Sequence, residues 1–111
     1  MENTVLEKFH QGRQSLGTFS AIGSPLAVEG LRYTGLDYVI VDTEHSPAGI
    51  ESAAAQIAAA QGAGLTALAR ANEISRTAVL RLLDVGAQGV VVPCVETVEE
   101  VRELVRYAKF A

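Results

Sequence analysis

The residues best suited to chemistry form one short cluster. Asp42, Glu44 and His45 directly follow the apolar run of residues 38–41. Carboxylates and an imidazole at the mouth of a buried strand can exchange protons with a substrate or bind a metal ion. The alternative is a structural role, because Asp42 also ends a strand and the Ser-Pro pair at 46–47 can begin a helix. The position at a strand end favours chemistry.

Two further charged residues follow apolar segments. Arg70 comes directly after a predicted strand, where its planar guanidinium can hold a carboxylate or a phosphate. A salt bridge to Asp42, Glu44 or Glu73 explains this arginine equally well. Asp84 lies near the end of an apolar helical stretch, where an acid opposes the helix macrodipole and calls for a partner. Taken alone, Asp84 is more simply interpreted as a solvated acid at a helix end.

The sequence contains no compact metal-binding motif. No residues have the spacing of HxxxH or CxxC, so any metal ion must take ligands that are far apart in the chain. Cys94 follows Pro93 at a predicted strand end, and a thiol with no His nearby is more often packed than reactive. His10 is predicted to be a surface residue of a helix.

Strands and helices alternate along the chain and must position these residues. Strands are predicted over residues 16–22, 38–41, 65–69 and 89–93. A helix over 4–11 is predicted to begin at a capping box of Thr4 and Glu7, and a helix over 25–35 is predicted to have Ser24 as its cap, with proline at its first position. Further helices are predicted over 48–61, from a cap at Asn72 or Ser75 to 86, and from a capping box at Thr97 and Glu100 to about 109. Several strands read as continuous apolar runs, which indicates a parallel sheet covered by helices and therefore the α/β class.

Two α/β architectures agree with this order of elements. A length of 111 residues favours an open doubly wound sheet, because a complete (β/α)₈ barrel needs roughly 250 residues. Charged residues after successive strands favour consecutive units of a barrel. The first strand is not followed by a glycine-rich phosphate fingerprint, since Gly17 and Gly23 are too far apart and lack a third glycine.

Composition narrows the partners and the location. The chain is 49% hydrophobic and 20% charged, with a net charge of −4 and no basic cluster, so nucleic acid is not expected as a partner. The longest uncharged stretch, residues 52–69, is interrupted by glycines and makes a poor membrane span. A single cysteine and an N-terminus without signal-peptide features predict a soluble, cytoplasmic domain.

Four segments together resemble the HpcH/HpaI aldolase/citrate lyase family of metal-dependent class II pyruvate aldolases. They are residues 35–47 (GLDYVIVDTEHSP), 69–72 (ARAN), 82–87 (LLDVGA) and 91–97 (VVPCVET). The D-x-E-H-x-P block and the later L-D-x-G-A are the most specific of these. The resemblance implies a (β/α)₈ TIM barrel, of which residues 1–111 would be the N-terminal half: the first four βα units with an N-terminal helix.

The resemblance also implies a reaction, a cofactor and an assembly. Family members cleave a 4-hydroxy-2-oxo acid into pyruvate and an aldehyde, and are usually hexamers. A divalent metal (Mg²⁺, Mn²⁺ or Co²⁺) polarises the 2-oxo group and stabilises the pyruvate enolate. The direct metal ligands of the family, a Glu and an Asp, lie on the fifth and sixth strands, beyond residue 111.

By resemblance, each candidate residue receives a role. His45 would exchange a proton with the 4-hydroxyl, and Asp42 or Asp84 would orient and charge-balance it. Arg70 would hold the oxygens of the pyruvate moiety, and Glu44 would hydrogen-bond a water on the metal. Asp84 would find its partner across a subunit boundary.

Three hypotheses follow. In the first, the chain is the N-terminal half of a pyruvate aldolase, and activity requires the other half. In the second, it is a non-catalytic half-barrel that associates or binds a small oxo acid, because an open parallel sheet has two edges to cover. In the third, it is an open doubly wound binding domain that shares only a strand-loop-helix motif.

Overall fold

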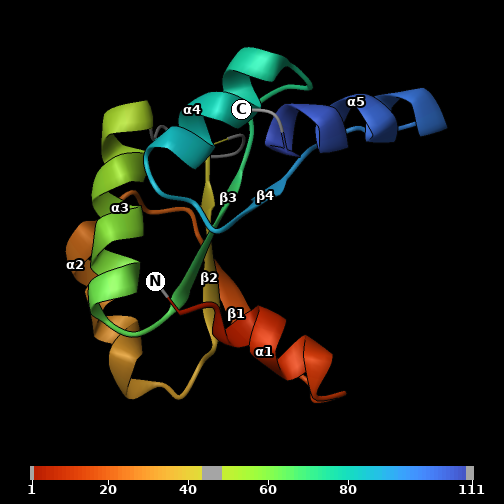
Figure 1. Ribbon diagram of the computed structural model, residues 1–111. Coiled ribbons are helices and arrows are strands. Elements are labelled where there is room, and N and C mark those ends of the chain that lie inside the picture. The colour runs from red at the N-terminus through yellow and green to blue at the C-terminus, as the bar shows by residue number, and fades with distance from the viewer. Residues whose placement is uncertain (1, 44–48, 110–111) are drawn as a thin grey trace.

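The computed structural model describes residues 2–43 and 49–109 (Figure 1). The N-terminal half of this part contains α1 (Thr4–His10), β1 (Gly17–Ser20), α2 (Pro25–Gly30), a short 3₁₀ helix η1 (Leu31–Tyr33) and β2 (Tyr38–Asp42). The C-terminal half contains α3 (Ile50–Gly62), β3 (Thr66–Arg70), α4 (Arg76–Asp84), β4 (Gly89–Val91) and α5 (Val98–Lys109). The alternation of strands and helices expected from the sequence is confirmed.

The strands form one parallel sheet in the order β1-β2-β3-β4. Ile40 on β2 is level with Phe19 on β1 and with Leu68 on β3, and Asp42 is level with Arg70. A doubly wound sheet reverses its strand order at a switch point, whereas consecutive barrel units keep the order of the chain. The observed order is that of barrel units, and the α/β class is confirmed.

One face of the sheet packs against helices and forms the core. Val39, Val41, Ala67 and Ala69 are completely buried on this face, where α3 contacts β2 and β3 and α2 packs against α3. Figure 1 shows α2 and α3 side by side along the sheet. Burial of this apolar surface is the main source of stability for such a layer.

Side chains alternate along a strand, so the residues between these core positions point to the opposite face. This face, which we call the open face, carries Phe19, Ile40, Asp42, Leu68, Arg70 and Val91. Phe19 is 50% exposed and Val91 is 36% exposed, in contrast to the buried residues of the helix face. Among the described residues, apolar side chains of the open face therefore contact solvent.

The N-terminal segment closes the amino end of the sheet. The backbone N–H of Thr4 donates to Oγ1 of Thr66 at 3.0 Å, and Nζ of Lys8 lies 2.7 Å from Oδ1 of Asp37. The hydrogen bond from Lys8, together with that from the backbone N–H of Leu16, lowers the pKa of Asp37. This end lies opposite the one where Asp42 and Arg70 stand.

Several helix boundaries differ from the sequence-based predictions. The cap of α1 is Asn3, whose side chain accepts from the N–H of Leu6, and not Thr4, whose N–H bonds to β3. The helix after Ser24 ends at Gly30 and continues only as η1, although the prediction extended it to residue 35.

Other caps agree with the predictions. Ser24 caps α2 with proline at the first helical position, and Ser75 caps α4. Thr97 and Glu100 form the expected reciprocal capping box, since each accepts the backbone N–H of the other at 3.1 Å. Over residues 2–43 and 49–109, no helix is long and apolar enough to cross a membrane.

Candidate functional site

Asp42 and Arg70 form an ion pair at the carboxyl ends of two neighbouring strands. They are the last residues of β2 and β3, are level in the register, and both project from the open face. Nη2 of Arg70 lies 3.3 Å from Oδ2 of Asp42. Asp42 is buried and the Arg70 side chain is mostly buried, so their attraction is less screened than that of a surface pair. The salt bridge proposed for Arg70 from the sequence is therefore present.

Hydrogen bonds from Thr43 connect the end of β2 to the end of β3. Its backbone N–H donates to the carbonyl oxygen of Arg70 at 3.2 Å, and its hydroxyl donates to the same oxygen. The register between β2 and β3 is thereby maintained one residue beyond the strands. The backbone that carries Asp42 and Arg70 is held in place by these contacts.

An aromatic ring that sequence reasoning missed lies beside Arg70. The Cζ atom of Arg70 lies 4.6 Å from the centroid of the Phe19 ring. Phe19 is on β1, so the guanidinium reaches across the end of β2 to meet it. The alternation of side chains on β1 would have placed Phe19 on the same face as Asp42 and Arg70, and this was the signal available in the sequence.

Two of the predicted site residues, Glu44 and His45, lie outside the described residues. Thr43, which precedes them in the chain, is beside Arg70. Their proposed roles stay predictions.

Asp84 is not brought to this site by the fold of a single chain. It is the exposed last residue of α4, a helix that starts from Ser75 after the carboxyl end of β3 and returns toward the amino end. Nine helical residues span about 13 Å. The carbonyl of nearby Gly86 accepts from Gln61, at the end of α3. Asp84 and Arg70 therefore occupy different ends of the sheet layer.

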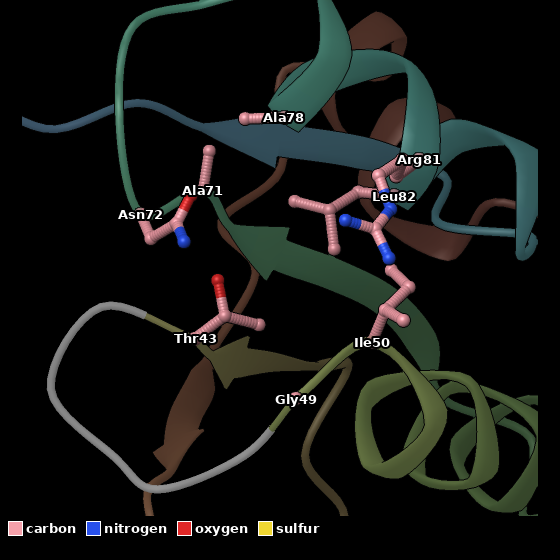
Figure 2. Close-up of a pocket in the computed structure, with 8 residues that line it drawn as sticks. All are labelled: Thr43, Gly49, Ile50, Ala71, Asn72, Ala78, Arg81 and Leu82. Carbon is pink, nitrogen blue, oxygen red and sulfur yellow. The ribbon is translucent and has the colours of Figure 1, made fainter.

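A shallow pocket lies behind the site, on the helix side of the strand ends. Figure 2 shows its lining, in which Asn72, Arg81 and Thr43 supply the polar groups and the rest are Gly49, Ile50, Ala71, Ala78 and Leu82. Residues from the ends of β2 and β3 and from α3 and α4 combine there. Sequence reasoning did not identify this pocket, because no single motif contains its residues.

The remaining sequence candidates lie at the surface. His10 is exposed, as predicted. Cys94 is also exposed, so its predicted packed position is wrong. It has a φ of 57°, in the left-handed region, within the turn that follows β4. Within the described part of the chain, no three His, Cys, Asp or Glu side chains lie close enough to hold a metal ion.

The arrangement defines an α/β protein of the barrel type whose candidate site lies at the carboxyl ends of parallel strands. The family model described as HpcH/HpaI aldolase/citrate lyase matches residues 15–111. The chain belongs to this family.

Individual relatives agree with this assignment. The hydroxypyruvate/pyruvate aldolase of Roseovarius nubinhibens is 32% identical over 97% of this chain and 42% of its own length. The 4-hydroxy-2-oxo-heptane-1,7-dioate aldolase of Escherichia coli is 29% identical over 99% of this chain and 42% of its own length. The crystal structure of an HpcH/HpaI aldolase from Desulfitobacterium hafniense superposes with a TM-score of 0.86 at 35% identity, over 94% of this chain and 40% of that one.

These comparisons fix the fold as a TIM-barrel type and the family as one that contains aldolases. The chain spans about two fifths of the length of the relatives that it matches.

Proposed function

We propose that this chain supplies the N-terminal half of a barrel enzyme that cleaves 4-hydroxy-2-oxo acids into pyruvate and an aldehyde, or forms them from these two compounds. The observation that carries the proposal is the Arg70–Asp42 pair at the carboxyl ends of β2 and β3. Active sites of barrels lie at this end of the strands. The aldolase names of the relatives supply the substrate class.

Arg70 is the proposed binding residue for the carboxylate and 2-oxo oxygens of the pyruvate moiety. A guanidinium has five N–H donors in one plane, and a fork of two such donors matches a carboxylate. Asp42 contacts Nη2 and fixes how the fork is turned.

His45 is the proposed group that exchanges a proton with the 4-hydroxyl when the carbon–carbon bond breaks or forms. Asp42 is positioned at the strand end from which the chain continues toward His45. Asp84 is proposed to act from a neighbouring subunit, because within one chain it is exposed and lies away from Arg70. Because this role needs a second copy of the chain, we propose that the protein is a homo-oligomer. We also propose that it is located in the cytoplasm.

The described residues contain no group of three His, Cys, Asp or Glu side chains that could hold the divalent cation implied by the family. Asp42, the buried carboxylate nearest the site, is engaged with Arg70. We therefore propose that the direct ligands of the cation come from beyond residue 111. Glu44 is proposed to lie near the cation without binding it directly. The described residues of this half are not proposed as ligands.

A second function is favoured by the open face. Its exposed apolar residues, Phe19 and Val91 among them, would be buried if the chain associates without catalysis or closes around a small oxo acid. Light scattering on the purified chain tests whether the chain associates on its own. A stable dimer or larger species supports association, and a well-behaved monomer contradicts it.

The aldolase proposal is tested by exchange of the pyruvate methyl protons with solvent in the presence of Mg²⁺ or Mn²⁺. The completed protein, as we call this chain joined to the part of the Roseovarius nubinhibens relative that follows the matched region, is compared with the chain alone. Exchange is expected only in the completed protein. Exchange by the chain alone would contradict the view that the second half is essential.

His45 is tested in the same completed protein. The change His45→Ala is expected to lower the rate of aldol cleavage by about 100-fold or more, as for loss of a general acid–base group. A variant that retains full cleavage would remove His45 from its proposed role.

A further inference from the structure

The contact between Phe19 and Arg70 joins two strands that are not neighbours. Phe19 is level with Ile40, whereas Arg70 is level with Asp42, two residues further along β2. The Arg70 side chain therefore crosses β2 on the open face, and its Cζ lies 4.6 Å from the centroid of the Phe19 ring. An arginine that served only to neutralise Asp42 would not need this reach.

The chemistry of the contact suits an arginine that must present its donors. The ring face carries negative charge density and attracts a cation within about 6 Å. When the guanidinium lies over a ring, its N–H bonds still point outward within its own plane. The ring therefore contacts the cation by its face and leaves the edge of the fork to oxygen atoms such as Oδ2 of Asp42.

The exposure of Phe19 fits this role better than a role in the core. Phe19 is half-exposed on the open face, whereas the core residues of β2 and β3 on the helix face are completely buried. Phe19 therefore gains less from burial than a core residue does, and its ring contacts the Arg70 guanidinium.

We infer that Phe19 is a positioning residue that orients the Arg70 guanidinium, through a cation–π contact, toward the oxygens of a 2-oxo acid. The inference rests on the proposed function of Arg70. Phe19 does not need to touch the substrate, because it acts through Arg70.

The contact itself is tested by NMR on the ¹⁵N-labelled chain. The guanidinium resonances of Arg70 are expected upfield of those of an arginine with no ring beside it, because Cζ of Arg70 lies over the Phe19 ring. Phe19→Leu is expected to remove this displacement. Phe9→Leu is the matched control, because Phe9 lies on α1, is 74% exposed, and has its ring beside His10. An Arg70 spectrum that is unchanged by Phe19→Leu would overturn the inference.

The consequence for binding is tested in the completed protein. Phe19→Leu is expected to raise the KM for pyruvate in methyl-proton exchange about fivefold and to change kcat less than twofold, the effect of losing one cation–π contact. Phe19→Trp, which keeps a ring face, is expected to restore KM. An unchanged KM in Phe19→Leu would contradict the positioning role.

The two proposals fail in different ways. Full exchange activity in Arg70→Ala would refute the proposed function of Arg70, and with it the consequence for KM, while the Arg70 resonances would still report the contact. A normal KM in Phe19→Leu combined with a large loss in Arg70→Ala would refute only the positioning role. Thermal unfolding of each variant establishes that it is folded.

Discussion

At the scale of single residues, Arg70 is held from two directions. Asp42 contacts its Nη2 atom and the Phe19 ring lies against its Cζ atom. Asp42 projects from β2 and Phe19 from β1, both on the open face, and the register of the sheet sets the distance between these two residues. The orientation of the guanidinium is thus a property of the fold and does not depend on a substrate.

The Asp42–Arg70 pair is expected to couple energetically. Asp42→Asn should lower the free energy of unfolding by about 1–3 kcal/mol, because a largely buried charge loses its partner. In a double-mutant cycle with Arg70→Gln, measured by urea unfolding of the chain, the coupling should be at least about 0.5 kcal/mol. Strict additivity of the two changes would argue against the pair.

At the scale of elements, polar contacts attach the N-terminal segment that contains α1 to the amino end of the sheet. Lys8 reaches Asp37 just before β2, and Gln88 donates to the carbonyl of Glu2 at 2.7 Å. None of the residues of α1 is buried. The attachment of this helix should therefore depend on charge, and hence on pH.

The pKa of Asp37 determines in which direction the stability changes with pH. Its pKa in the folded chain lies below the ordinary value of 3.8, because the Lys8 side chain and the Leu16 N–H donate to its carboxylate. Its contribution to stability is complete at pH values above 3.8 and is lost as pH falls through the lowered pKa. Urea unfolding across this range should show the stability of the wild-type chain converging on that of Asp37→Asn at low pH. A difference that stays constant with pH would contradict the assignment.

The approach of β1 to β2 depends on a glycine. A Cβ atom at Gly17 would lie 2.3 Å from the ring of Tyr38, so the ring packs directly over the backbone of β1. Gly17→Ala should lower the free energy of unfolding by about 1–3 kcal/mol through overpacking. The control is Gly30→Ala at the end of α2, where no atom lies within 4 Å of the added Cβ. That change should be neutral or stabilising by up to about 1 kcal/mol, and equal losses in the two variants would contradict the packing argument.

At the scale of the whole molecule, the two central strands were predicted closely from the sequence, whereas the outer strands β1 and β4 both end two residues earlier than predicted. The run at 38–41 and the run at 65–69 correspond to β2 and β3 within one residue, because continuous apolar segments buried in a parallel sheet have few alternatives. Helix ends were predicted less well. The cap of α1 moved to Asn3, because Thr4 uses its backbone N–H in a contact with Thr66, which is far away in the sequence.

The site was only partly predictable for a similar reason. Asp42 and Arg70 stand at strand ends, so topology alone brings them together once the sheet is parallel. Phe19 was missed because its contact with Arg70 depends on the path of a long side chain across β2. The separation of Asp84 from this site could not be predicted from a local sequence pattern, because it depends on the direction in which α4 runs.

The central claim is that Arg70, fixed by Asp42 and Phe19, holds the oxo acid. It is tested most directly by the kcat/KM for pyruvate methyl-proton exchange in the completed protein carrying Arg70→Lys, with Arg102→Lys as the matched control. Arg102 lies on α5, and its side chain is exposed. Loss of bidentate binding should lower kcat/KM at least about tenfold in Arg70→Lys, and Arg102→Lys should stay within twofold of the unsubstituted protein. Equal activity in Arg70→Lys and Arg102→Lys would contradict the account.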